Sequence, residues 1–349
     1  EMGAYEFVKR IYVDVKATAG DETGYSWQHA YTDLQDGLAA STAGYEIWVA
    51  RGTYLPSQTE DRDASFRLKP GVNVYGGFGG NTFLGSGDPF DQAVYLETAR
   101  DQRITDPLKG KTILSGDLLG DDNEGWDIIG SPENYEDNSK IVVRAAGNGE
   151  RVLDGFIVQG GSGGDSGPST VATLEQPAGI FVGSGNLTVR NCMVRRNRGY
   201  GLAAENQSST SILVIQQCVI SENDFGVVGY FGSVEVDISA SAIVGNQVGV
   251  FCGFGNLSLS FTTVSGNFNN RDNLLSGVTI VGTSASANTL EVSHSVLWGN
   301  YVLSATEVGW TSTRRGSLGI GVEDATVSHS LIQIWNPAGT GNLDGTDAA

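Results

Sequence analysis

Hydrophobic and polar residues alternate through the middle of the chain in a pattern that returns five times. Each copy reads aliphatic-x-aliphatic-x-x-(Cys/Ser/Thr)-x-aliphatic-x-x-Asn, and all five copies keep the five key positions. The copies end at Asn197, Asn223, Asn246, Asn267 and Asn300, so they lie 26, 23, 21 and 33 residues apart. The alternation has the two-residue period of a strand with one buried face. Repetition at this spacing predicts a solenoid with loop insertions of varying length.

A glycine followed by a short apolar run precedes each copy, at Gly179, Gly201, Gly226, Gly249 and Gly277. Each repeat therefore offers three short strands, and three strands per turn predict a parallel β-helix whose strands pair with their equivalents ~4.8 Å away in the next turn. Crossovers between parallel strands are nearly always right-handed. We expect an all-β fold, a right-handed parallel β-helix of about ten turns, as a single domain over residues 1–349.

Two positions of the repeat carry polar or small side chains that the coil is expected to stack. Asn tolerates left-handed backbone and its amide can bond to an equivalent Asn one turn away, so the Asn residues predict a structural ladder. Cys192 and Cys218 share the Cys/Ser/Thr position and are interpreted as small core residues, with a bridge between adjacent turns as the alternative. One turn earlier, we align Ile157 with Val194.

The N-terminal part of the chain combines strands with one helical pattern. Ser26 suits an N-cap, and apolar residues recur at helical spacing from Trp27 to Ala40, which predicts a capping α-helix over residues 26–41 at the open end of the coil. Residues 1–10 are expected to be a linker or an exchanged strand. Two polar excursions, residues 81–111 and 117–138, interrupt the coil, and long excursions from a repeat body usually carry binding.

Composition narrows the classes of function. The net charge is −19 and the pI is near 4.4, which argues against nucleic acid and anionic membrane surfaces as partners. No apolar run approaches the ~20 residues of a membrane helix, so no membrane insertion is expected. The chain has 3 cysteines, too few for a disulfide framework. These features fit an extracellular or cell-surface protein.

Several motifs resemble a known group of bacterial proteins. Ile11-Tyr-Val-Asp14, Gly24-Tyr-Ser-Trp27, Gly52-Thr-Tyr-Leu-Pro56 and Ile113-Leu-Ser-Gly-Asp117 look like segments of large surface or secreted proteins with right-handed parallel β-helix repeats. These proteins are similar to the polymorphic outer-membrane-protein type and share the pectate-lyase-like superfold. The resemblance implies a location at the cell surface or outside the cell, but the group mostly lacks an assigned activity.

The opening segment, residues 2–7, resembles the sequence with which such modules normally end. This indicates a chain cut from a tandem array, or a protomer whose N-terminal strand completes a neighbour. An arbitrary chain boundary is the alternative.

Candidate metal ligands lie in the second excursion. Asp117, Asp121, Asp122 and Asp127 form an oxygen-rich run with glycines for tight turning, and Ca²⁺ prefers several such oxygens on a flexible loop. We therefore consider a bound Ca²⁺, with a solvated acidic loop as the alternative. No other cofactor is expected.

Two further groups of side chains, one of arginines and one of histidines, are candidates for binding. Arg190, Arg195, Arg196 and Arg198 form a local basic run that is suited to uronate or sulfate groups of a glycan, although Arg196 faces Glu222 one turn on and a salt bridge there is the alternative. His294 and His329 share an outward position and are interpreted as stacking surface residues, with a metal site or an acid–base pair as the alternative.

No catalytic residue is assigned. Resemblance to polygalacturonases would require Asn-x-Asp, Asp-Asp and Gly-His-Gly on successive turns, and pectate lyases carry Trp-x-Asp-His; the repeat turns show none of these motifs. The favoured hypothesis is a non-enzymatic structural or adhesive module that joins copies of itself head to tail in a filament or tandem array. The alternative is a polysaccharide lyase or hydrolase, or a glycan-binding protein, that acts on an acidic surface polysaccharide beside the excursions.

Overall fold

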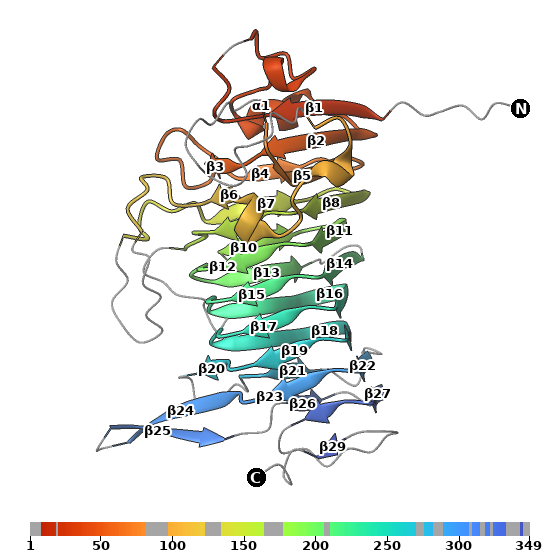
Figure 1. The fold of residues 1–349 in the computed structure, drawn as a ribbon. Coiled ribbons are helices and arrows are strands. Elements are labelled where there is room, and N and C mark those ends of the chain that lie inside the picture. Colours follow the sequence, from red (N-terminus) through yellow and green to blue (C-terminus); the bar gives the residue numbers. More distant parts are fainter. Residues whose placement is uncertain are drawn as a thin grey trace, which may run out of the picture.

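The computed structural model is a column of stacked turns, with the first strands at one end and the last at the other (Figure 1). The structure describes residues 8–18, 20–80, 97–122, 134–163, 177–205, 210–269, 276–281, 289–306, 309–314, 318–321, 324–332 and 343–344. Successive turns pair in parallel, as at β11 (Gly185–Arg190) and β14 (Ser211–Gln216), where Leu187 lies opposite Leu213. The predicted right-handed parallel β-helix is confirmed.

Each complete turn contributes one strand to each of three columns. The first column contains β4 (Phe66–Leu68), β7 (Ile141–Ala145), β10 (Ala178–Val182), β13 (Tyr200–Glu205), the first parts of β16 (Phe225–Ser239) and β18 (Val248–Ser260), β21 (Val278–Val281) and β26 (Leu318–Gly321). The second contains β1 (Lys9–Val13), β2 (Tyr45–Ala50), β5 (Asn73–Phe78), β8 (Glu150–Asp154), β11, β14, the second parts of β16 and β18, β22 (Thr289–Ser293) and β27 (Asp324–Ser328). The third contains β3 (Gly52–Tyr54), β6 (Thr112–Ser115), β9 (Ile157–Gln159), β12 (Met193–Arg195), β15 (Val219–Ser221), β17 (Ala242–Val244), β19 (Thr263–Ser265), β23 (Val296–Trp298), β28 (Leu331–Ile332) and β29 (Leu343–Asp344).

The third column forms a 10-stranded sheet with one strand per turn, which agrees with the expected number of turns. One antiparallel hairpin departs from the coil: β24 (Tyr301–Thr306) pairs with β25 (Gly309–Arg314), and β20 (Phe268–Asn269) joins its edge. The hairpin projects sideways near the C-terminal end (Figure 1). In the described part of the chain, no helix has the length and apolarity that a membrane span requires.

Two tight corners per turn explain the spacing inside the repeat. The residue before each Cys/Ser/Thr position is left-handed, with φ of 50° at Asn191 and 48° at Ala240, and its N–H donates to a carbonyl of the next turn. A second left-handed residue precedes each ladder Asn, as at Arg196 with φ of 52°. Gly155, with φ of 87°, occupies the first corner one turn earlier, so Val158 and not Ile157 pairs with Val194. Our alignment of Ile157 with Val194 is therefore wrong by one residue.

The predicted Asn ladder is confirmed as a buried chain of amides. Nδ2 of Asn223 donates to Oδ1 of Asn246 at 2.9 Å, and Nδ2 of Asn246 donates to Oδ1 of Asn267 at 3.0 Å. The ladder also explains the repeated glycine, because a Cβ at Gly201 would come within 2.9 Å of the Asn223 amide nitrogen. A larger residue there would displace the ladder.

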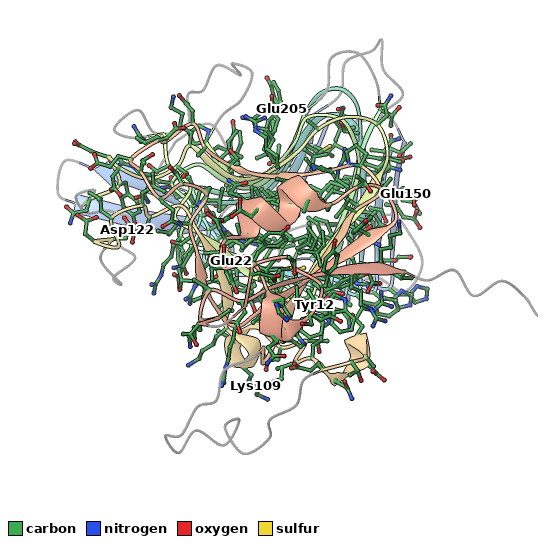
Figure 2. All side chains as sticks on the ribbon, turned by 90° about the horizontal axis from the view of Figure 1, so that it is seen from above. Tyr12, Glu22, Lys109, Asp122, Glu150 and Glu205 are labelled. Atoms are coloured by element: carbon green, nitrogen blue, oxygen red, sulfur yellow. The ribbon has the colours of Figure 1, made fainter. Side chains whose placement is uncertain are left out.

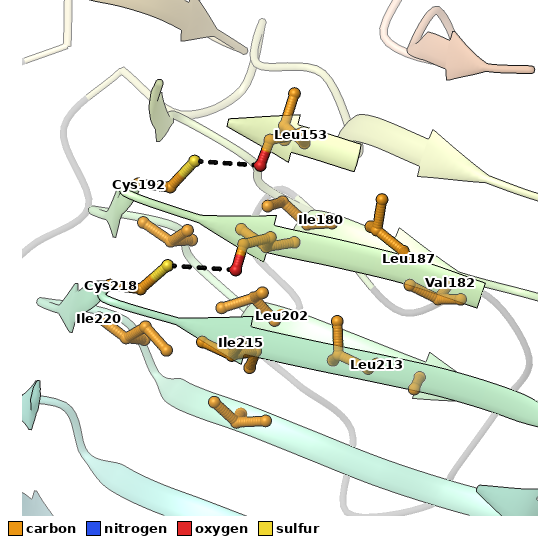
Figure 3. Packing of buried hydrophobic residues seen from close by; sticks show 14 of the residues in the cluster. Leu153, Ile180, Val182, Leu187, Cys192, Leu202, Leu213, Ile215, Cys218 and Ile220 are labelled. Carbon is orange, nitrogen blue, oxygen red and sulfur yellow. Dashed lines mark hydrogen bonds between the residues drawn. The ribbon is translucent and has the colours of Figure 1, made fainter. Parts of the chain in front are cut away.

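The interior holds stacked aliphatic side chains and three buried cysteines, of which Cys192 and Cys218 are labelled in Figure 3. Cys192 and Cys218 are free thiols in adjacent turns, and their Sγ atoms donate to the carbonyls of Leu153 and Val189 at 3.7 and 3.5 Å. Burial raises the pKa of Cys252 to about 12, so this thiol stays protonated at neutral pH. The cysteines therefore serve as small core residues, as predicted.

The N-terminal cap is confirmed as a helix, but over a shorter range than residues 26–41. A 3₁₀ turn, η1 (Trp27–His29), is separated from α1 (Leu34–Ala40) by extended residues. Within that break, Tyr31 pairs with Val13 of β1, which satisfies backbone groups at the outer edge of the first strand. The N-cap is Asp33, whose side chain accepts from the N–H of Gln35, and Ser26 makes no side-chain cap. Pairing with β1 thus outweighs the local helical pattern.

The first excursion also packs on the coil where it is described. It contains η2 (Arg100–Gln102) and α2 (Pro107–Gly110), while residues 81–96 lie outside the described residues. Arg103 inserts beside β8 and its Nη2 lies 2.6 Å from Oδ1 of buried Asp154, which also binds Arg190. This end of the excursion is an anchored structural segment.

Candidate functional site

Loops from several turns gather at the corner between the third column of strands and the first. The second excursion leaves after β6 and returns before β7, and the neighbouring loops follow β3 and β12. Seen along the coil axis, Asp122 of this excursion lies at the periphery, on the opposite side from Glu150 (Figure 2). The corner therefore presents side chains beyond the packed coil.

Backbone contacts fix the loops to one another. Nε of Arg62 donates to the carbonyl of Asn138 at 2.8 Å, and its Nη2 donates to the carbonyl of Ser162 at 3.0 Å. The N–H of Ser162 in turn donates to the carbonyl of Ser139. Arg62 therefore ties three successive turns together at this corner.

An open cleft of about 590 Å³ lies among these loops. Its polar lining combines four carboxylates, one amide, one guanidinium and one phenol ring, which are contributed by Glu60, Asp121, Glu136, Asp137, Asn134, Arg198 and Tyr135. The guanidinium of Arg198 lies 5.9 Å from the centre of the Tyr135 ring. The volume falls in the range of small-ligand sites.

Three carboxylates form a cluster at the wall of the cleft. Asp117, Asp121 and Asp137 each place one oxygen within 4.8 Å of the others. Asp117 accepts the N–H groups of Gly120 and Asp121 through Oδ1, at 2.6 and 3.1 Å. Asp137 accepts the N–H of Leu119 at 2.9 Å. Both carboxylates are thus held in place by backbone, whereas Asp121 is exposed and supplies the third oxygen.

Asp122 is next to this cluster, and its backbone N–H donates to Oδ2 of Asp117 at 3.3 Å. Burial raises the pKa of Asp122 to about 7, and the negative charges of Asp117, Asp137 and Asp121 add to the effect. Its Oδ2 accepts from Nδ2 of Asn138 at 2.9 Å, which opposes the rise. Asn138 is completely buried, yet its Oδ1 has no hydrogen-bond partner among the described residues.

The structure brings together two of the four predicted metal ligands, Asp117 and Asp121. Asp122 is turned toward Asn138 instead, and Asp127 lies outside the described residues. Sequence reasoning missed Asp137 because it is 16 residues from Asp121 in the chain. The position of Asp137 could have been predicted from the ends of the excursion. Both ends attach to the same corner of the coil, so its first and last residues must lie close together.

The predicted basic run is dispersed. Arg190 binds Asp154, Arg195 donates to Gln159, and Arg196 pairs with Glu222 at 2.9 Å, as the alternative interpretation proposed. Of the four arginines, Arg198 lines the cleft.

The histidines stack, as predicted. The rings of His294 and His329 lie 4.9 Å apart and nearly parallel, and Phe261 extends the stack at 4.7 Å from His294. Their ring planes face one another, so the lone pairs of their nitrogens, which lie in the ring planes, do not converge on one point. The stack is therefore poorly suited to holding one metal ion.

Comparison with known proteins identifies the family. The model of the right handed beta helix region matches residues 92–269, about half of the chain. The chain therefore belongs to the right-handed β-helix family. No curated protein matches the sequence.

Solved structures give distant likenesses. One is the A-module of mannuronan C-5 epimerase AlgE6 from Azotobacter vinelandii, with 11% identity and a TM-score of 0.33 over 95% of this chain and 99% of that chain. Another is a rhamnogalacturonan lyase, with 12% identity and a TM-score of 0.36 over 92% and 87%. A third is YbhC of Escherichia coli, with 12% identity and a TM-score of 0.39 over 96% and 84%. With every TM-score below 0.5, these likenesses do not transfer a substrate to this chain.

Proposed function

We propose that this chain is a glycan-binding protein that holds a polysaccharide strand in the cleft at the corner of its β-helix. The observation that carries the proposal is the convergence of Tyr135, Arg198 and four carboxylates around one open cleft of about 590 Å³. This is the alternative weighed from the sequence, placed at the second excursion.

The chemistry of the lining suits a sugar. Carboxylates accept hydrogen bonds from hydroxyl groups, and bonds to charged groups are stronger than those between neutral groups. An aromatic ring such as that of Tyr135 offers an apolar face to a pyranose. Arg198 supplies the cation to which a sugar carboxylate can bind in a bidentate manner. We therefore expect an acidic sugar unit at Arg198 and hydroxyl contacts elsewhere.

The test compares two hexasaccharides, hexagalacturonate and cellohexaose, by isothermal titration calorimetry. Wild type is expected to bind hexagalacturonate, and Arg198→Gln is expected to weaken that binding by about tenfold, the loss of one charge-assisted contact. Tyr135→Ala is expected to weaken binding of either sugar. Arg67→Gln, which removes an exposed cation from β4, is the matched control and should leave affinity unchanged.

Failure of both sugars to bind would contradict the proposal. Equal losses in Arg198→Gln and Arg67→Gln would also contradict it, because net charge and not the cleft would then govern binding. If the hexagalacturonate is shortened during the titration, the cleft both binds and cleaves its ligand, which supports the glycan assignment.

Head-to-tail assembly, the favoured hypothesis from the sequence, stays a prediction. At the N-terminal end, the N–H groups of Tyr12 and Asp14 already bond to the carbonyls of Gly24 and Tyr31. A copy stacked on this end would have to displace that segment. These bonds weigh against simple end-to-end pairing at the N-terminal end.

A further inference from the structure

We propose that Arg100, Arg190 and the phenol of Tyr75 bind an oxyanion, such as a sulfate or carboxylate group, on the outer face of the second column. The site lies beside the first excursion and shares no residue with the cleft. The proposal therefore does not depend on glycan binding in the cleft.

Successive strands place these side chains in one row. In the parallel register, Tyr75 of β5 lies opposite Asp154 of β8, and Asp154 lies opposite Arg190 of β11. The residues just before them, such as Val74, belong to the core, so the row faces away from it. Arg100 of η2 reaches the row from the excursion, because its Nη1 donates to the hydroxyl oxygen of Tyr75 at 2.8 Å.

The phenol of Tyr75 connects the two arginines. Burial raises the pKa of Tyr75, whereas the positive charges of Arg100 and Arg190 oppose the rise, so both guanidinium groups act on the phenol. The phenol oxygen accepts from Arg100, but its O–H has no acceptor among the described residues. Tyr75 is 2% exposed, and buried polar groups are nearly always paired. An oxyanion between the arginines would accept this hydrogen bond.

Both arginines also keep donors that no described residue uses. Arg100 donates through Nη1 to Tyr75 and Glu46, and Arg190 donates through Nε to Asp154. Each guanidinium has five N–H donors, so the others remain for a ligand. The two side chains are 47% and 34% exposed, which lets a ligand reach them from solvent. Guanidinium groups bind oxyanions through charge-assisted and often bidentate hydrogen bonds.

The local charge favours an anion, although the whole chain has a net charge of −19. Both carboxylates of the group, those of Glu46 and Asp154, already pair with guanidinium groups, and Asp154 binds two of them. Arg10 adds a cation that forms no ion pair among the described residues, with Cζ 4.5 Å from the centre of the Trp48 ring, whose Nε1 bonds Glu46. Asp101, exposed in η2, forms no ion pair with the described residues either. The group thus has an excess of positive charge, which a bound oxyanion neutralises.

The experiment titrates sodium sulfate into the wild-type protein by isothermal titration calorimetry, at constant ionic strength because salt screens exposed charges. We expect binding with Kd on the order of 1 mM. Arg198→Gln, which removes the cation of the cleft, should retain this binding. Absence of sulfate binding to wild type would overturn the proposal, and so would its loss in Arg198→Gln, since sulfate would then bind in the cleft. The outcome is independent of the hexasaccharide test, because sulfate alone is the probe.

Three variants locate the site. Tyr75→Phe keeps the buried ring and removes the hydroxyl, and Arg100→Gln removes one cation, so each should weaken sulfate binding about tenfold. Arg67→Gln, which removes an exposed cation from β4, is the matched control and should bind sulfate as wild type does. Equal weakening in Arg100→Gln and Arg67→Gln would overturn the proposal, because net charge would then govern binding. Circular dichroism checks that each variant is folded, and Tyr75→Phe tests the site if Arg100→Gln does not fold.

A hexasaccharide of chondroitin sulfate separates the two sources of such a group. Binding tighter than that of inorganic sulfate, with the same weakening in Arg100→Gln, would assign the site to a sulfated glycan. An affinity no higher than that of inorganic sulfate would assign it to the free ion. Either result supports an oxyanion site at Arg100, Arg190 and Tyr75.

Discussion

Asn246 shows what one residue contributes to the coil. Its Oδ1 accepts from the backbone N–H and the side-chain Nδ2 of Asn223, at 3.0 and 2.9 Å. Its Nδ2 donates to Oδ1 of Asn267 and to the carbonyl of Ile220, each at 3.0 Å. All of these atoms are shielded from water, so every bond that is lost leaves an unsatisfied buried group.

We predict that Asn246→Ala lowers the free energy of unfolding by about 3 kcal/mol, because a buried group left unpaired costs about 1–3 kcal/mol and several are left here. Urea denaturation followed by circular dichroism measures the change. Gln217→Ala, at an exposed left-handed corner of the preceding turn, is the control and should change stability by less than about 0.5 kcal/mol. Similar losses in both variants would show that the ladder is not a special source of stability.

The left-handed residues at the corners between strands set the shape of each turn. Ala240 adopts φ of 48° between β16 and β17, and its methyl group is exposed. For L-residues this conformation costs free energy because Cβ contacts the backbone, whereas glycine has no Cβ. Two residues further on, Ala242 lies in the extended strand β17, where glycine only adds conformational entropy to the unfolded chain.

We predict that Ala240→Gly stabilises the fold by about 0.5–1 kcal/mol, since relief at the left-handed corner exceeds the entropic cost of glycine. Ala242→Gly should destabilise it by about 0.5–1 kcal/mol. Thermal unfolding of the two variants should therefore show shifts of opposite sign. A loss of stability in Ala240→Gly would contradict this account of the corners.

At the scale of elements, the two-residue alternation predicts the strands because each strand buries one face against the interior. It does not predict the break in the capping helix. Trp27, Ala30, Tyr31 and Leu34 follow helical spacing, but the backbone of Tyr31 pairs with β1, and nothing local in the sequence indicates that distant demand. The one-residue shift at Gly155 was hidden similarly, because glycine can serve either as a corner or as a ladder position.

For the whole molecule, the fold can be predicted from the sequence because every turn repeats the same pattern of buried positions. The residues of the cleft follow no repeat, so the same pattern does not predict them. The cleft combines Glu60, Asp121, Tyr135 and Arg198 from loops of three different turns. Their convergence depends on the path that each loop takes around the corner. Hydrophobic periodicity predicts the strands but does not predict the paths of the loops. The acidic run therefore indicates the excursion that lines the cleft, but it does not indicate which of its carboxylates lie together.

The capping helix α1 covers the N-terminal end of the coil. Leu38 of α1 is buried with Ile11 and Val13 over the first turn, so α1 shields the apolar side chains at this end of the coil. We predict that Leu38→Asp destabilises the protein by about 3 kcal/mol or more, through lost packing and a buried carboxylate. If loss of this packing also releases the Gly24–Tyr31 segment, the edge of β1 becomes uncovered and should pair with other chains, because exposed strand edges are templates for association.

Size-exclusion chromatography with light scattering, over a range of protein concentrations, measures this association. Ala40→Asp adds the same charge at an exposed position of α1 and should behave as wild type. If Leu38→Asp keeps the mass of wild type at every concentration, the edge of β1 is blocked by the Gly24–Tyr31 segment alone, since that segment bonds to Tyr12 and Asp14 independently of α1. Association of Leu38→Asp but not of Ala40→Asp would instead establish that packing of α1 keeps this end of the coil closed.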